Sequence, residues 1–201
     1  KAGEYIKEIK IDINHFYSSF QLRAINTLKF IQDTLRDKRE PIRAWQLNER
    51  HYGVLTGLNK DEMKEKFGED KIHAFRRSWD IKPDPLSRNN PYHPLNIEIY
   101  KNIPKENIPD TESLKDTYER VMKFYIDEIQ EKLKNNENIL ISAHGNSIRA
   151  LCKFLFKLDN QKITLLEIPT GNPLLISLDS KQDIIECSYL DQGRAKDLLV
   201  F

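Results

Sequence analysis

The segment from Asn138 to Phe156 constrains the fold more than any other part of the chain. Residues 138–143 form a short, mostly apolar run, which predicts a strand buried on both faces. His144-Gly145-Asn146-Ser147 then makes a tight turn, and residues 148–156 have the apolar spacing of a helix. A buried strand, a tight turn and a helix in this order are typical of a parallel sheet in an α/β protein.

The rest of the chain has patterns that agree with this fold class. Apolar residues at helical or strand spacing predict helices over 20–36, 60–67, 69–78, 113–134 and near 160–167, and strands over 11–17, 41–45, 173–178 and 183–189. We predict an α/β three-layer sandwich, in which helices flank a mostly parallel sheet. It should form a single domain over residues 1–201, with residues 79–110 as a long surface excursion.

Composition excludes several classes of protein. The 201 residues hold 32 Lys+Arg against 31 Asp+Glu, a net charge of +1, which argues against a strongly basic nucleic-acid binder. No apolar run is long enough to span a bilayer, so we expect no membrane partner. Two cysteines, Cys152 and Cys187, are too few for a disulfide framework or a thiolate zinc site. We expect two buried free thiols in a cytoplasmic protein.

His144 and Gly145 stand at the predicted carboxyl end of a strand, where ligands bind in open α/β sheets. The next helix begins there, so its free N–H groups point at the same place. Gly145 has no Cβ to keep an anion from the backbone. A histidine at this position can bind phosphate, act as a nucleophile or act as a general acid. The alternative is a histidine that only caps the turn.

The stretch Trp45–Gly53 holds a carboxylate, a cation, a histidine and a phenol, and Lys60 follows soon after. Glu49 is a candidate general acid and base if its carboxylate is partly buried beside a bound phosphate. The alternative is surface ion pairing among Glu49, Arg50 and Lys60.

Three arginines complete the set of candidate groups. Arg76 and Arg77 are adjacent on a predicted helix, and Arg23 lies near the start of another. Guanidinium groups suit an anion with several oxygens, although a solvated helix face explains Arg76-Arg77 equally well. Cations, a histidine and a carboxylate together suit phosphoryl transfer or phosphomonoester binding.

These stretches also resemble a known family. The matching residues are Ser18-Ser19, Arg23–Ile25 with Thr27, Leu47–Gly53, Gly57–Lys60, Arg76–Ser78, Glu112–Thr117, Ala143–Ala150 and Ile168–Gly171. In this order they resemble the 2,3-bisphosphoglycerate-dependent phosphoglycerate mutases of the histidine phosphatase superfamily, over nearly the whole chain.

The resemblance implies a role for each matching side chain. His144 would stabilise the transferring phosphoryl group, and Glu49 would exchange protons with the substrate hydroxyls. Arg23 would bind the transferring phosphate, and Gly145 and Asn146 would bind phosphate at the helix N-terminus. The substrate's carboxylate and second phosphate would be held by Tyr52, Lys60, Arg76 and Arg77. We assign the pair Arg50-His51 no direct catalysis.

The implied activity is the interconversion of 3-phosphoglycerate and 2-phosphoglycerate in glycolysis and gluconeogenesis. It would run through a phosphohistidine primed by 2,3-bisphosphoglycerate, without a metal, in a cytoplasmic homo-oligomer, a dimer or tetramer. Two alternatives stay open: a bisphosphoglycerate mutase or phosphatase with the same site, and a catalytically inactive phosphoglycerate-binding protein.

One motif of the family does not occur in residues 1–201. The nucleophilic histidine of the family lies in an Arg-His-Gly motif that ends its first strand. His15 lies inside a later predicted strand and cannot replace it. Losing the family's first strand would leave its neighbours without ladder partners in a dry core. We therefore expect the biological protein to carry a few dozen residues before Lys1. The tail from Leu190 onward matches the family only weakly.

Overall fold

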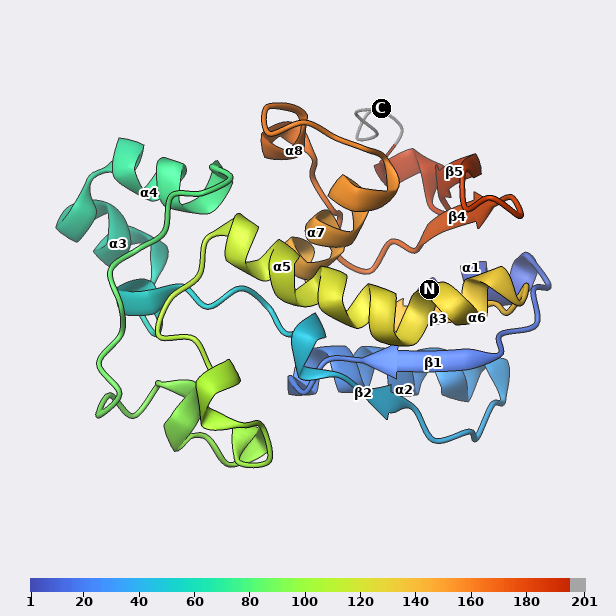
Figure 1. Cartoon of the computed structure of the whole chain (residues 1–201), viewed down its shortest axis with the longest axis horizontal. Helices are drawn as coiled ribbons and strands as arrows, with labels where there is room; N and C mark the ends of the chain where they lie inside the picture. The colour runs from blue at the N-terminus through green and yellow to red at the C-terminus, as the bar shows by residue number, and fades with distance from the viewer. Residues whose placement is uncertain (196–201) are drawn as a thin grey trace. The chain divides into compact units, whose positions relative to one another are not determined.

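The computed structural model describes residues 1–195 of the chain (Figure 1). By its internal contacts the chain divides into two compact units. Unit 1 comprises residues 1–49 and the chain from Arg120 onward, and unit 2 comprises Arg50–Glu119. The single domain expected from the sequence stays a prediction.

Unit 1 is built on a three-stranded parallel sheet. β1 (His15–Ser18) lies between β2 (Ile42–Arg43) and β3 (Ile139–Ser142) and pairs with both in parallel. Ser18 stands opposite Ser142, so β1 and β3 end at the same edge of the sheet. Chain segments that leave these two strands therefore start side by side.

Helices cover both faces of this sheet. Phe16 packs with Leu28 of α2 (Leu22–Leu35), and the ring of Tyr17 meets that of Phe124 edge-on with centroids 5.5 Å apart. Phe124 ends α5 (Leu114–Phe124). Successive strand residues point to opposite faces, so α2 and the end of α5 lie on opposite sides of β1 (Figure 1). A parallel sheet flanked by helices confirms the predicted α/β class.

The helix predicted over 113–134 is present in three consecutive parts. α5 continues into a π-helical turn (Tyr125–Ile129) and then into α6 (Gln130–Lys134). The Ser113 hydroxyl accepts from the backbone N–H of Asp116 at 3.1 Å, and the Asp116 carboxylate accepts from the Ser113 N–H at 2.8 Å. This reciprocal pair forms a capping box at the start of α5.

The start of α2 differs from the sequence-based expectation. The apolar spacing predicts a helix from residue 20, but α2 begins at Leu22, and its N-cap Gln21 makes no side-chain capping bond. The Ser19 hydroxyl instead accepts from the Gln21 N–H at 3.1 Å and contacts His144. Ser19 therefore contacts His144 at the edge of the sheet and is not the N-cap of α2.

The remaining elements follow the predicted order. Unit 1 also contains α1 (Ala2–Glu8), α7 (Gly145–Leu155), α8 (Lys162–Leu165) and the antiparallel pair β4 (Leu174–Leu178) and β5 (Ile184–Tyr189). Unit 2 contains α3 (Lys60–Phe67) and α4 (Glu69–Arg77). From there to α5 the chain has only short 3₁₀ turns: Pro94–Asn96, Glu98–Tyr100 and Lys105–Asn107.

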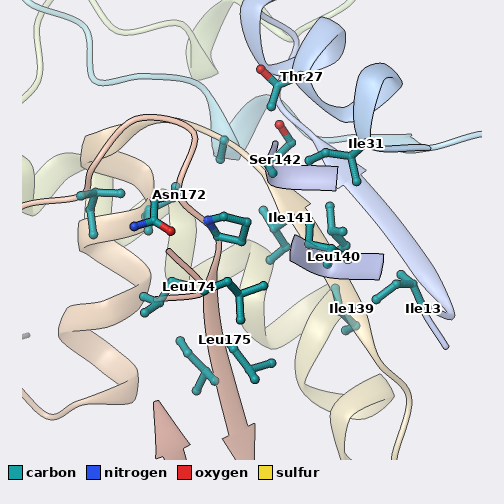
Figure 2. Close-up of a pocket in the computed structure, with 18 of the residues that line it drawn as sticks. Ile13, Thr27, Ile31, Ile139, Leu140, Ile141, Ser142, Asn172, Leu174 and Leu175 are labelled. Carbon is teal, nitrogen blue, oxygen red and sulfur yellow. The ribbon is translucent and has the colours of Figure 1, made fainter. Parts of the chain in front are cut away.

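A groove of about 790 Å³ lies in unit 1 between β3 and β4 (Figure 2). Its lining includes Ile13, Ile139, Leu140, Ile141, Leu174 and Leu175. The three β3 residues in this set are only half-buried, so the prediction of a strand buried on both faces is wrong. Among the described strands, β3 pairs with β1 alone, which leaves its other edge beside the groove.

Candidate active site

The parallel register brings Ser19 and His144 together where β1 and β3 end. The Ser19 hydroxyl lies 2.7 Å from Nε2 of His144, and Nε of Arg23 donates to Nδ1 at 2.9 Å. A guanidinium can only donate, so Nδ1 of His144 is the acceptor nitrogen. The proton of the neutral imidazole then lies on Nε2 and is donated to Ser19.

Burial keeps this imidazole neutral. His144 is buried, and desolvation is the main cause that lowers its pKa to about 4, with the charges of Arg23 and Arg120 acting in the same direction. The carboxylate of Glu49 opposes this shift and is outweighed. At neutral pH His144 is therefore an uncharged donor and acceptor.

Glu49 is the carboxylate of this site, and the N-terminus of α7 holds it. Oε1 accepts from the backbone N–H of Asn146 at 3.3 Å and from its side-chain Nδ2 at 2.9 Å. Oε2 lies 3.8 Å from Nη2 of Arg23 and 4.0 Å from the position of a Cβ built on Gly145. Free N–H groups and the helix dipole both stabilise an anion here.

The main chain around Glu49 is also fixed by side chains. Arg120 donates to the carbonyl of Gln46, and through Nη2 to the carbonyls of Asn48 at 2.9 Å and Glu49 at 3.4 Å. The Glu49 N–H donates to Oε1 of Gln21 at 3.1 Å. These bonds fix the main chain of the irregular segment around Glu49, and so they fix the point from which the Glu49 side chain extends.

Unit 2 carries the other predicted binding residues. Arg76 and Arg77 end α4, where Arg76 is exposed and Arg77 half-buried, and Tyr52 packs on the cluster around Leu55. The Lys60 backbone begins α3, but its side chain lies outside the described part of the structure.

Arg50 has a structural position within unit 2. Its guanidinium carbon lies 4.5 Å from the centroid of the Tyr52 ring, and Nη2 donates to the Arg76 carbonyl at 3.3 Å. The side chain is buried. It therefore links the Tyr52 segment to the end of α4.

The structure brings together Arg23, Glu49, His144, Gly145 and Asn146. Sequence reasoning missed three residues that shape this group: Ser19 as the partner of His144, Arg120 behind Glu49, and Arg149 behind Asn146. Ser19 and Arg149 lie inside stretches that match the family, but nothing in their spacing indicates these contacts. Arg120 carried no signal in the sequence.

Residues 1–195 also bear on two other classes of site. They contain no group of three or more His, Cys, Asp or Glu side chains placed to hold a metal ion. Within the same part of the chain, no helix is both long and apolar enough to cross a membrane. The tail from Leu190 onward, which matches the family only weakly, includes residues 196–201, which lie outside the described residues.

Comparison with solved structures supports the fold. A mycobacterial glucosyl-3-phosphoglycerate phosphatase superposes with a TM-score of 0.65 at 16% identity, over 94% of this chain and 80% of that one. A Bacillus stearothermophilus protein, YhfR, gives a TM-score of 0.63 at 16% identity, over 91% of this chain and 77% of its own. At these identities the likeness concerns the fold alone.

Sequence comparison gives the family. The model of the histidine phosphatase superfamily (branch 1) matches residues 1–93 and 90–189. A 2,3-bisphosphoglycerate-dependent phosphoglycerate mutase of Pelagibacter ubique is 90% identical over 201 residues, covering 100% of this chain and 84% of the relative. The enzyme of that name from Maricaulis maris is 42% identical over 98% of this chain and 82% of its own length. The chain therefore belongs to the 2,3-bisphosphoglycerate-dependent phosphoglycerate mutases of the histidine phosphatase superfamily.

Proposed function

We propose that this protein interconverts 3-phosphoglycerate and 2-phosphoglycerate through a phosphohistidine enzyme primed by 2,3-bisphosphoglycerate. The observation that carries the proposal is the placement of Glu49 beside His144 and Arg23, at the carboxyl edge of a parallel sheet. A carboxylate, a neutral imidazole and an exposed guanidinium supply a proton acceptor, a neutral hydrogen-bonding group and an anion-binding group.

Each of these residues is placed to carry out one part of the proposed reaction. Glu49 accepts the proton of the attacking substrate hydroxyl and returns it when the phosphate leaves. Arg23, whose side chain is 69% exposed, binds the transferring phosphate. His144, with Gly145 and Asn146, stabilises the phosphoryl group as charge develops on its oxygens.

The remaining predicted roles form part of the same proposal. Tyr52, Lys60, Arg76 and Arg77 bind the substrate's carboxylate and second phosphate. The enzyme acts in the cytoplasm as a homo-oligomer, a dimer or tetramer, and needs no metal. Reading the coding sequence upstream of Lys1 for an Arg-His-Gly motif tests where the nucleophilic histidine of this reaction lies.

The direct test uses the protein expressed from its complete coding sequence. Conversion of 3-phosphoglycerate is followed by phosphorus NMR with and without 2,3-bisphosphoglycerate, and release of inorganic phosphate is measured in parallel. We expect primer-dependent isomerisation and an acid-labile phosphoryl group on the enzyme after incubation with the primer. Hydrolysis that dominates without primer would contradict the mutase assignment.

A further inference from the structure

The side-chain amide of Asn146 joins two groups of opposite charge. Its Nδ2 donates to Oε1 of Glu49 at 2.9 Å, and its Oδ1 accepts from Nη1 of Arg149 at 3.0 Å. Arg149 lies three residues further along α7 and is buried. A buried cation is thus connected to the carboxylate of the site through one amide group.

The two neighbours of Asn146 require the same orientation of that amide. Arg149 can only donate, so the atom facing it must be the acceptor oxygen. An ionised Glu49 can only accept, so the atom facing it must be the donor nitrogen. A flipped amide would place oxygen against carboxylate and NH₂ against guanidinium, which costs both bonds at once.

Arg149 is itself fixed in place. Its Nη2 donates to the carbonyl of Ile163, in α8, at 2.6 Å. The guanidinium therefore bridges α8 and the first turn of α7, and its planar shape sets the direction of both bonds. A lysine has a single nitrogen and no such fixed fork.

We propose that Arg149 is a positioning residue, which holds the Asn146 amide with its nitrogen toward Glu49 and so favours the ionised, proton-accepting form of Glu49. This inference rests on the proposed proton-transfer role of Glu49. Arg149 acts through Asn146, which is hydrogen-bonded to both Arg149 and Glu49.

Other charged groups also face Glu49 and set the background for this effect. Arg23 of α2 lies 3.8 Å from Oε2, the imidazole of His144 is close enough to interact, and Arg120 of α5 binds the Glu49 carbonyl. None of these contacts determines which end of the Asn146 amide meets Oε1. Their contribution remains in a variant that lacks Arg149.

The test compares Arg149→Met and Arg149→Lys with the unsubstituted protein, expressed from the complete coding sequence. Methionine keeps an unbranched stem but removes both donors, and lysine keeps the charge with one nitrogen. We expect the acidic limb of the kcat/KM profile to move up by about one pH unit for methionine and by less for lysine. KM for phosphoglycerate should change little, since Arg149 does not line the site.

Lys153→Met is the matched control. Lys153 lies one turn beyond Arg149 on α7, is partly buried, and donates to the carbonyl of Leu158 at 2.7 Å. The substitution likewise removes a cation and a bond to a main-chain carbonyl, here that of Leu158. We expect its acidic limb to coincide with that of the unsubstituted protein.

A carbon-detected NMR titration of the Glu49 carboxyl supplies a second readout that does not need turnover. An upward shift of the Glu49 titration in either Arg149 variant supports the proposal. Titrations that coincide with the unsubstituted protein in every folded variant would overturn it, even if rate and stability fall. Failure of the proposed function appears separately, as absence of phosphoglycerate turnover in the unsubstituted protein.

Discussion

Nε of Arg23 donates a hydrogen bond to Nδ1 of His144 at 2.9 Å, which makes this histidine an acceptor toward a cation. Such a contact requires a neutral ring, because a protonated imidazole would present an N–H to a guanidinium. Burial and the nearby arginines favour the same protonation state. The tautomer and charge of His144 are thus determined by its surroundings.

The replacement Glu49→Gln tests proton transfer in the full gene product. Glutamine keeps the size of the side chain and can still bond to Asn146, but it cannot accept the hydroxyl proton. We expect kcat to fall by about 10²- to 10⁴-fold. Phosphorylation of the enzyme by 2,3-bisphosphoglycerate, measured as acid-labile phosphate, should fall much less. Unchanged turnover would remove Glu49 from the proton-transfer role.

The buried His144 predicts a loss of stability in mild acid. Its folded pKa of about 4 lies below the ordinary 6.5, so between these values the unfolded chain binds a proton that the folded chain does not. Stability is therefore full above pH 6.5 and falls as the pH decreases toward 4. The His144 contribution is on the order of 3 kcal/mol.

Urea unfolding of the protein and of His144→Asn between pH 7 and pH 4 measures this contribution. Asparagine keeps an acceptor for Arg23 but does not titrate in this range. His51, whose pKa burial also lowers, contributes to both proteins and cancels in the difference. If the two unfolding free energies fall in parallel with pH, the predicted protonation of His144 on unfolding is wrong.

The variant Gly145→Ala separates anion approach from folding at the start of α7. A Cβ at Gly145 would lie 4.0 Å from Oε2 of Glu49, an ordinary van der Waals distance, so it fits without strain. We expect unchanged thermal stability and a KM for phosphoglycerate raised about tenfold, equivalent to about 1.4 kcal/mol. Steady-state kinetics and a melting curve on the same sample check both parts. A KM equal to that of the unsubstituted protein would show that no substrate oxygen approaches this backbone.

The variant Gly53→Ala tests the packing of the segment that carries Tyr52. Gly53 has a φ of +54°, and a Cβ there would lie 2.1 Å from the Asp84 carbonyl oxygen. We expect a loss of more than about 2 kcal/mol in unfolding free energy, measured by urea denaturation. Gly68→Ala is the control, because Gly68 has a φ of +79° with nothing within 4 Å, and should cost about 1 kcal/mol. Equal losses for both variants would contradict a steric role for Asp84.

Most of the fold was predictable because it depends on local periodicity. The helices over 60–67 and 69–77, and the long helix from residue 114, follow apolar spacing and capping residues that the sequence displays directly. β3 was also placed correctly. Its burial was not, because that depends on which strand lies beside it, a property of distant chain segments.

The sequence was enough to predict which residues form the candidate site, but not the contacts between them. Glu49, His144 and Arg23 belong to stretches that match the family. The contacts that define their chemistry join residues far apart in the chain, such as Asn146 and Glu49, 97 positions apart. Arg149 shows the limit most clearly, since it contributes through an amide orientation that no sequence pattern encodes.

The groove between β3 and β4 also determines how this polypeptide behaves during purification. Among the described residues, no strand pairs with the edge of β3 that faces the groove, and an open strand edge can pair with an extended segment of another chain. In concentrated samples of residues 1–201 alone, the molecules should therefore self-associate, and light scattering should rise with protein concentration. Handling such samples at low concentration and low temperature would slow that precipitation, because hydrophobic attraction weakens on cooling.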